Sequence, residues 1–378
     1  TLELIKLRMP LVGNNIGKRR LTMFLPHELI IQILLWLPVK SLLLFKCVCK
    51  SWFSLISHDP HFANSHFQLT TNRRILFISS THESLSIDFE ASIHNDSACL
   101  SLNLPEDFTA FEVKGSCRGF ILICGSLNMY LWNPSTRVHK QIPLSPFSSD
   151  LDEAHYFYGF GYDHSTDDYL VVLMSYHYYS EEPPLHLEYF SLKANAWKQV
   201  KGPHFAYTLE DEPKGGCLYN GAIHWLLAYC ITDVILAFDL MERKLSYMHL
   251  PSDSHGDPLQ CGGLWVYGEF LSLYTKNYGK DTVQIWVMKE YKVSSSWTII
   301  LVLPLDLIIR HKADFFPLCC TKSGDIIGVD EDNGLVKFDK KGRFLDLHSY
   351  PKYDLRCKVT MCIDSLLSLP GDGDNTQA

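Results

Sequence analysis

The spacing of apolar residues changes once along this chain of 378 residues, near residue 70. Between residues 22 and 69, apolar runs are interrupted by Pro38 and by Asp59-Pro60, and this pattern predicts short helices. From about Arg73 onward, short apolar runs alternate with turns of Gly, Asn-Pro, Asp and Ser, which is typical of β-strands. The pattern predicts an α+β multidomain chain, with a small helical domain over 22–69 and an all-β domain over 73–365. Residues 1–21 and 366–378 are expected to be flexible ends.

Three helices are expected in the first domain, and the first two are apolar around most of their circumference. Pro26 suits a first helical turn, because its missing N–H would be unpaired there, and Pro38 ends that helix. Ser41 can cap a second helix, and a third, over 52–56, stops before Asp59-Pro60. Three short helices in fewer than about 50 residues rarely build an adequate core alone. Either the β-domain or a second protein is therefore expected to cover them.

The β-domain repeats a pair of signals about every 50 residues. A small turn precedes an apolar strand each time, and then come an aromatic strand, a polar turn and a further strand. The turns fall at Gly119, Asp168, Gly221, Gly268 and Gly324, and the aromatic residues are Trp132, Phe190, Phe238, Trp286 and Phe338. A period of this length with about four strands per unit is typical of kelch-type propeller blades. The repeat therefore predicts a propeller-like domain of five to six blades, the sixth combining residues 73–92 with strands near 356–363. A pair of β-sandwiches is the alternative.

Composition and charge narrow the function classes. With 47% hydrophobic and 20% charged residues the chain is globular, and its formal net charge of −8 argues against a general nucleic-acid surface. No apolar run approaches the roughly 18 residues of a membrane-spanning helix and no secretory signal is visible, so we expect a soluble protein of the cytoplasm, the nucleus or both. The basic Lys18-Arg19-Arg20 is a solvated tail or a weak nuclear signal. The 12 cysteines include no C-x-x-C pair, so we expect reduced thiols and no zinc site.

The motifs that resemble catalytic or ligand sites are all incomplete. Gly159-Phe-Gly161 lacks the third glycine of a dinucleotide loop, and the acidic run 330–334 lacks the glutamate of a calcium loop. His155, His164 and His177 are close in sequence, but alternate residues of a strand point to opposite faces, which disfavours a metal site. We therefore expect no cofactor, no metal and no catalysis.

Residues 25–62, LPHELIIQILLWLPVKSLLLFKCVCKSWFSLISHDPHF, closely resemble the F-box found in the large plant families. The matching features include Leu25-Pro26, Glu28, Leu37-Pro38-Val39-Lys40-Ser41-Leu42 and Cys47-Val48-Cys49-Lys50-Ser51-Trp52. The later phrases GSCRGFILIC, LWNPSTRVHKQIP, GFGYDHSTDDYLVV and GAIHWL resemble the F-box-associated interaction region of plant F-box proteins, which the pollen S-locus F-box group shares. Together the two resemblances cover residues 22 to about 365.

This resemblance implies a non-catalytic substrate receptor of a ubiquitin ligase. Proteins of this kind dock on the Skp-type adaptor of a Skp–cullin–F-box ligase, reach the cullin and RING subunits through it, and hold a target protein with their C-terminal domain for ubiquitination. The expected cover of the helices is then the adaptor. The resemblance implies adaptor contact by Leu25, Pro26, Ile30, Ile33, Leu34, Leu37, Pro38, Val39, Leu42, Val48 and Trp52, and the sequence does not separate those that face inward.

The target is expected to bind the loops that join strands on one face of the propeller. The repeats differ most over 145–158, 176–186, 202–214 and 252–260, segments rich in Tyr, His, Pro and acidic residues. We expect a target with a basic patch, held by Asp152, Glu153, Tyr156, Glu181, Glu182, Glu210 and Asp211. Two alternatives stay open: an F-box scaffold that works outside the ligase, and a propeller hydrolase whose acids or metal ligands converge on the central channel.

Overall fold

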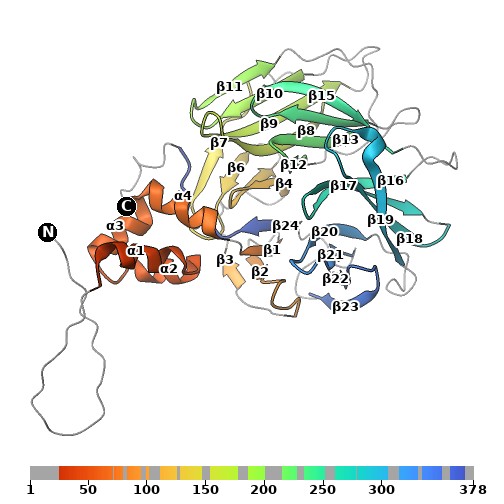
Figure 1. Ribbon diagram of the computed structural model, residues 1–378. Helices are drawn as coiled ribbons and strands as arrows, with labels where there is room; N and C mark the ends of the chain where they lie inside the picture. Colours follow the sequence, from red (N-terminus) through yellow and green to blue (C-terminus); the bar gives the residue numbers. More distant parts are fainter. Residues whose placement is uncertain are drawn as a thin grey trace, which may run out of the picture.

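The computed structural model describes residues 25–70, 72–79, 83–94, 99–101, 111–125, 128–146, 154–177, 186–200, 215–227, 234–251, 260–277, 279–304, 315–330, 334–350 and 358–370. Helices α1–α4 come first in this part of the chain, and strands β1–β24 form a ring beside them (Figure 1). None of the helices described is long and apolar enough to cross a membrane.

Four helices, rather than the three expected, make up the helical domain: α1 (His27–Leu35), α2 (Val39–Phe45), α3 (Lys50–His58) and α4 (Pro60–Leu69). Asp59-Pro60 ends α3, as expected, but it also starts α4. The Asp59 carboxylate accepts hydrogen bonds from the backbone N–H groups of His61 and Phe62 at 2.9 and 3.0 Å, and Pro60 occupies the first turn. The same two residues are therefore a stop signal for one helix and a cap for the next.

The described strands form six four-stranded antiparallel sheets, which confirms the propeller and excludes the pair of sandwiches. From the innermost strand outward, three blades are β4 (Phe111–Cys117), β5 (Phe120–Gly125), β6 (Met129–Trp132) and β7 (His139–Ile142); β8 (Ala154–Asp163), β9 (Asp168–His177), β10 (His186–Ser191) and β11 (Ala196–Val200); and β12 (Cys217–Tyr219), β13 (Ala222–Leu227), β14 (Val234–Asp239) and β15 (Lys244–His249). The other three are β16 (Gln260–Tyr267), β17 (Phe270–Asn277), β18 (Thr282–Met288) and β19 (Trp297–Pro304); β20 (Phe316–Cys320), β21 (Ile326–Val329), β22 (Gly334–Phe338) and β23 (Phe344–Ser349); and β24 (Lys358–Ile363), β1 (Arg73–Ile78), β2 (Glu83–Ile87) and β3 (Cys99–Ser101). A short 3-10 helix, η1 (Ser294–Ser296), precedes β19.

The ring is closed by strands from both ends of the chain, as predicted for the sixth blade. β24 pairs antiparallel with β1, placing Arg73 opposite Ile363 and Ile78 opposite Lys358. The first strands of neighbouring blades contact one another all the way round, in the order β24, β4, β8, β12, β16, β20 and back to β24. Closure leaves no blade with an open face at the end of the array.

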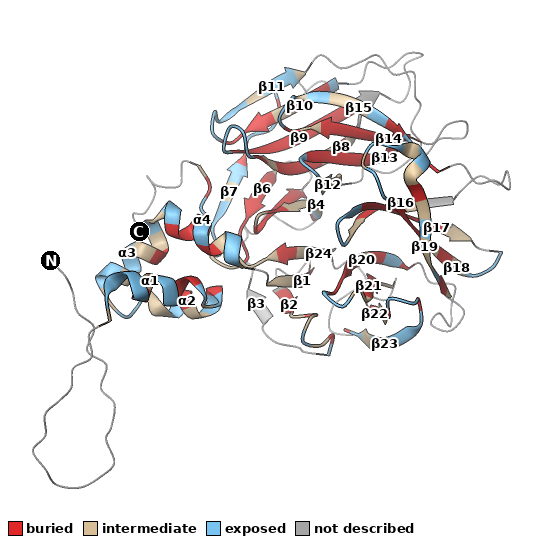
Figure 2. Cartoon of the chain, in the orientation of Figure 1, coloured by how far each residue is buried: buried red, intermediate tan, exposed pale blue. Residues whose placement is uncertain are grey.

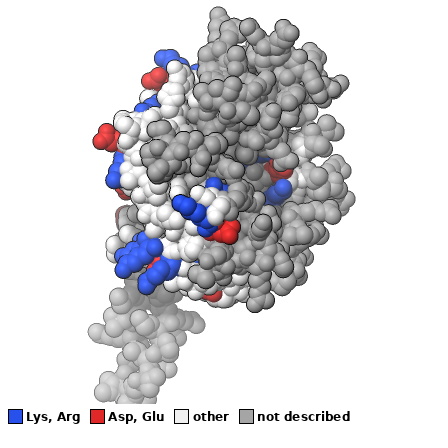
Figure 3. Space-filling view, turned by 90° about the vertical axis from the view of Figure 1, so that its right-hand side faces the viewer, with Lys and Arg blue, Asp and Glu red and all other residues white. Residues whose placement is uncertain are grey.

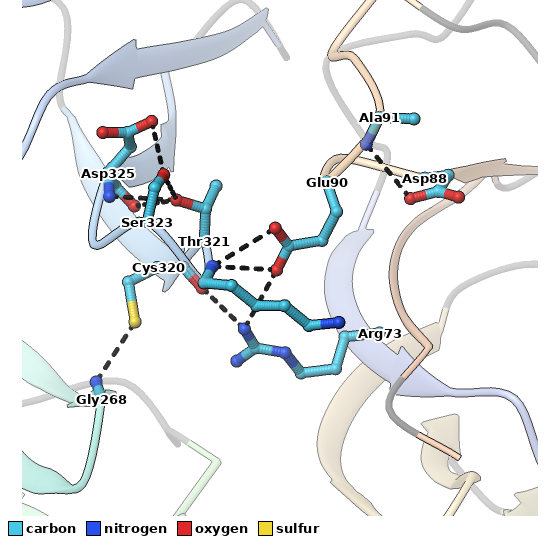
Figure 4. Close-up of polar contacts among 10 residues, drawn as sticks. Arg73, Asp88, Glu90, Ala91, Gly268, Cys320, Thr321, Ser323 and Asp325 are labelled. Carbon is cyan, nitrogen blue, oxygen red and sulfur yellow. Dashed lines mark hydrogen bonds and ion pairs between the residues drawn. The ribbon is translucent and has the colours of Figure 1, made fainter.

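Polar contacts also join the closing blade to its neighbour (Figure 4). Arg73 donates to the carbonyl oxygen of Cys320 at 2.9 Å and pairs with Glu90 at 3.4 Å. The Glu90 carboxylate accepts from the backbone N–H of Lys322 at 3.1 and 3.2 Å, and the Cys320 sulfur accepts from the N–H of Gly268 at 3.2 Å. Three consecutive blades, those of β1, β20 and β16, are thus linked through side chains.

The repeated residues have a common structural reason. The aromatic residue on the third strand of five blades is buried, at no more than 8% exposed, because it packs in a cluster with residues of the preceding blade of the ring: Trp132, Phe190, Phe238, Trp286 and Phe338. Four of the five repeated turns place glycine at a positive φ, between 59° and 88°, a conformation that other residues adopt only with strain: Gly119, Gly221, Gly268 and Gly324. The fifth turn, at Asp168, instead puts Asp167 at φ 51°.

The helical domain and the ring share one hydrophobic core. Leu34, Ile56 and Phe62 of the helices belong to the same cluster of buried residues as Phe120 and Ile142 of the first blade. The chain after β24 joins this cluster through three buried leucines, Leu366, Leu367 and Leu369. This corrects the expected start of the flexible C-terminal tail, because residues 366–370 pack between the two domains instead of extending into solvent.

Candidate interaction surfaces

Six large apolar side chains on helices α1–α3 and the connections between them are exposed (Figure 2). They are between 48 and 71% exposed, and we call them the exposed helical face: Leu29, Ile33, Trp36, Leu44, Val48 and Phe53. Leu29, Ile33 and Trp36, the residue that caps α1, follow the i, i+4, i+7 spacing of one helix stripe, about 110° around the helix from the buried Ile30 and Leu34. An apolar surface of this kind marks an interaction site.

The structure divides the predicted adaptor-binding residues into three groups. Pro26, Ile33, Pro38 and Val48 are exposed, and Leu25, Leu37 and Trp52 are half-buried. Ile30, Leu34, Val39 and Leu42 are at most 6% exposed and form the core of the domain, so they support the surface from inside. Leu29, Trp36, Leu44 and Phe53 are exposed but were missed in the sequence, where the only available signal was the helical stripe of α1.

A buried histidine fixes the connection between α1 and α2. His66 of α4 is 1% exposed, and its Nε2–H donates to the carbonyl oxygen of Leu37 at 2.8 Å. Its Nδ1 accepts from the Thr70 hydroxyl at 3.4 Å, and its ring stacks on Phe62 with 6.3 Å between ring centroids. Because the hydrogen bond from His66 holds the carbonyl of Leu37, it also fixes the orientation of the exposed Pro38, the next residue.

The ring has a turn side and a loop side. In the five blades built from consecutive strands, the connections from the first strand to the second and from the third to the fourth lie on the turn side, as the register of β8 and β9 shows: Asp163 faces Asp168 at the turn, and Ala154 faces His177 at the far end. The strand ends that flank the variable segments 145–158, 176–186, 202–214 and 252–260 all lie on the opposite side, the loop side. The strand ends that carry the loops predicted to bind the target therefore all lie on one face of the ring.

Most of the predicted target-binding residues lie outside the described residues: Asp152, Glu153, Glu181, Glu182, Glu210 and Asp211. Tyr156 is described, at the loop-side end of β8, where it is half-buried and 6.3 Å from the ring of Tyr158 between centroids. Burial and the nearby Glu188 carboxylate raise the pKa of Tyr156, so its hydroxyl is a neutral hydrogen-bonding group at physiological pH.

The central channel contains a cavity of about 620 Å³, lined by residues of the inner strands β4, β12, β16, β20 and β24. On its loop side, Glu112 lies between two lysines: it is paired with Lys114, and the Lys358 ammonium is 3.8 Å away. Lys114 also lies over the ring of Tyr158, at 5.2 Å from its centroid. Partial burial opposes ionisation of Glu112, but the two ammonium groups lower its pKa. The described charges at this mouth are therefore of both signs.

The side of the ring that carries β16–β19 also shows both signs of charge among the described residues, without a single-sign field (Figure 3).

The incomplete motifs of the sequence have structural roles. Gly159 and Gly161 allow the next blade to approach, since a Cβ there would lie 2.7 Å from Ile223 and 2.5 Å from Leu240. His164 lies at the turn end of the β8–β9 hairpin, whereas the backbone positions of His155 and His177 are at its other end. Among the described residues, no group of three or more His, Cys, Asp or Glu side chains can hold a metal ion.

The described cysteines are free, and burial makes most of them poor nucleophiles. Burial raises the pKa of Cys117, Cys124 and Cys217 to about 12, and raises that of Cys319 and Cys362 as well. Cys47, on the helical domain, is exposed. The buried thiols are packing residues of the blades.

Comparisons with known proteins agree with this architecture. Residues 64–337 match the F-box associated beta propeller domain family, and residues 23–68 match the F-box-like family. Three similar proteins come from Arabidopsis thaliana. An F-box/kelch-repeat protein is 28% identical and covers 85% of this chain and 91% of its own length. The F-box protein CPR1 is 27% identical, with 84 and 83% covered, and a further F-box protein is 30% identical, with 78 and 83% covered. Among solved structures, TolB from Acinetobacter baumannii covers 80% of this chain and 72% of its own, with a TM-score of 0.43 and 10% identity. The chain belongs to the family of F-box proteins that carry an F-box-associated β-propeller domain.

Proposed function

We propose that this protein is a substrate receptor of a Skp–cullin–F-box ubiquitin ligase. Its F-box helices bind the Skp-type adaptor, and through it the cullin and RING subunits, while the ring holds a target protein for ubiquitination. The receptor itself is non-catalytic and works in the cytoplasm, the nucleus or both.

The observation that carries this proposal is the exposed helical face on an F-box. The six large apolar side chains of this face are exposed on a domain of only four short helices, while the inward residues of the same helices pack against the ring. Burial of one such side chain contributes about 1.5–3 kcal/mol. A protein partner that covers this face would gain several such contributions, and the F-box match indicates a Skp-type adaptor as that partner.

The proposal is tested by comparing target ubiquitination with and without adaptor binding. The wild-type chain and a variant with Ile33→Asp and Val48→Asp are expressed in plant cells with a proteasome inhibitor, and the captured proteins are compared by mass spectrometry. The proposal expects the variant to lose adaptor and cullin but to retain the same targets, which then carry less ubiquitin. Equal ubiquitin on targets of both forms would favour a scaffold outside the ligase.

A further inference from the structure

The turn between β4 and β5 reaches from the ring to the helical domain through one side chain. The Arg118 guanidinium donates to the side-chain oxygen of Asn64 on α4 at 2.8 Å and lies 4.9 Å from the ring centroid of Phe67 on the same helix. On its other side it lies 4.1 Å from the ring centroid of Tyr162 and donates to the Tyr169 hydroxyl at 3.3 Å. Arg118 therefore contacts α4 and the blade of β8 and β9 at the same time.

A segment after β24, residues 364–370, lies along the same junction, and we call it the C-terminal strap. It passes beside β7 and α4 (Figure 1), and its leucines are buried in the cluster that contains Leu34 and Phe62 of the helices and Phe120 of the ring. The strap is therefore an apolar layer shared by both domains.

Hydrogen bonds tie both ends of the strap. The amide group of Asn133, which is fully buried, donates to the carbonyl oxygens of Ser365 and Leu367 at 3.2 Å each, and Lys140 on β7 donates to that of Pro370 at 2.6 Å. At its start, Asp364 accepts from the side chain of Asn72, the residue before β1, at 2.7 Å. Asn72 lies in the short connection from α4 to the ring. The strap is therefore hydrogen-bonded both to that connection and to the blade of β4–β7.

The β4–β5 turn is shaped to accept the strap. A Cβ at Gly119 would lie 2.2 Å from the Cβ of Ser365 and 2.8 Å from the carbonyl oxygen of Ile363. Gly221, in the equivalent turn of the blade of β12, has a similar positive φ, 71° against 84°, but nothing lies within 4 Å of its Cβ position. The close approach at Gly119 thus belongs to the strap and not to the turn itself.

We propose that Arg118 and the C-terminal strap are positioning elements that hold the F-box helices in one orientation relative to the ring. The effect of this orientation on ubiquitin transfer rests on the proposed function. If the protein is a ligase receptor, a target on the ring is held at a defined place relative to the adaptor and the ligase. Group transfer depends steeply on the orientation and effective concentration of the two reactants. A loosened junction would therefore slow ubiquitin transfer while leaving the adaptor face and the target face intact.

The test measures the orientation directly, in the full-length chain with and without adaptor. Spin labels are placed at two exposed positions, by Lys40→Cys on α2 and Lys341→Cys in the turn before β23, in a Cys47→Ser background. Arg118→Ala is compared with Arg137→Ala, since Arg137 also has a positive φ, 64°, and is an exposed turn residue of the same blade. Gly119→Ala is compared with Gly221→Ala, which shares the backbone strain but not the collision with the strap.

Electron–electron distance measurements are expected to give a narrow distribution for the wild type and both controls. Arg118→Ala and Gly119→Ala are expected to broaden it at least about twofold. Amide exchange of α4 is expected to be about tenfold faster in Arg118→Ala, because one charged hydrogen bond is lost, and faster in Gly119→Ala, because the new Cβ displaces the strap. Adaptor affinity, measured in the same samples, is expected to stay within about twofold of wild type. The inference is overturned if the distance distributions of Arg118→Ala and Gly119→Ala are as narrow as that of the wild type. It is also overturned if the distributions of Arg137→Ala and Gly221→Ala broaden equally. A wild-type chain that does not bind adaptor overturns the proposed function instead, while the distance distributions still test the junction.

Discussion

Neighbouring residues of α1 should respond in opposite ways to the same kind of truncation, because one is exposed and the other is core. Ile33 is 51% exposed and Leu34 is 0% exposed. Ile33→Ala removes three carbons, worth about 0.8 kcal/mol each when buried, and about half of their surface is still free for the adaptor to cover. We expect a loss of about 1.2 kcal/mol of binding free energy, or about an eightfold higher Kd, with little change in stability.

Leu34→Ala should instead cost about 2–5 kcal/mol of the free energy of unfolding, since it leaves a cavity in the shared core. Its affinity for the adaptor, measured by calorimetry at a temperature where the variant is folded, should stay within about twofold of wild type. Ile299→Ala is the matched control, because Ile299 is 41% exposed but lies on β19, outside the helical domain. The reasoning is refuted if Ile33→Ala binds like wild type, or if Ile299→Ala weakens binding as much as Ile33→Ala does.

Three further outcomes are expected. His224 is buried, donates through Nδ1 to the carbonyl of Cys217 at 3.1 Å and accepts from the Tyr291 hydroxyl at 2.8 Å; burial lowers its pKa from 6.5 to about 4. The unfolded chain therefore binds a proton at His224 at higher pH than the folded chain, and up to about 3 kcal/mol of stability, present above pH 6.5, is lost as pH falls toward 4. Urea unfolding at pH 5 and 7.5 should show this loss in wild type and a smaller one in His224→Gln; equal losses would contradict it. A thiol reagent should modify the exposed Cys47 in the native protein well before Cys117 or Cys362, and rapid labelling of the last two would show that the blades open. At high protein concentration the chain alone should self-associate and the adaptor should make it monodisperse, whereas equal behaviour in both conditions would mean that the exposed helical face needs no cover.

The ring could be predicted from the sequence because its repeat is a packing requirement. Five of the six blades place an aromatic residue such as Phe238 against a neighbouring blade and contain a turn at positive φ such as that at Gly221, so the same residue types return about every 50 positions. The closing blade has neither of these signals, but it could be predicted because a ring of blades closes only when strands from the two ends of the β-region pair, as β1 and β24 do.

The helical domain could be recognised from the sequence, but its exposed and buried faces could not be told apart. Its first two helices are apolar all round, so spacing alone could not show that Ile33 points out while Leu34 and Leu42 point in; this depends on where the ring and the strap lie. From the sequence, residues 366–370 of the strap are expected to belong to a flexible tail, because a short leucine-containing segment after the last repeat has no periodic signal. Its role comes from tertiary contacts with Asn133 and Gly119, which are distant in sequence.

The central claim, that the F-box helices of this chain join it to a ubiquitin ligase, is tested most directly by reconstitution. The full-length chain is mixed with a purified Skp-type adaptor and a cullin–RING pair, and the molar mass is measured by light scattering after size exclusion. We predict one complex with a single copy of each subunit, which is lost with Ile33→Asp and Val48→Asp together. A chain that is folded and monodisperse but elutes apart from the adaptor and the cullin would contradict the account.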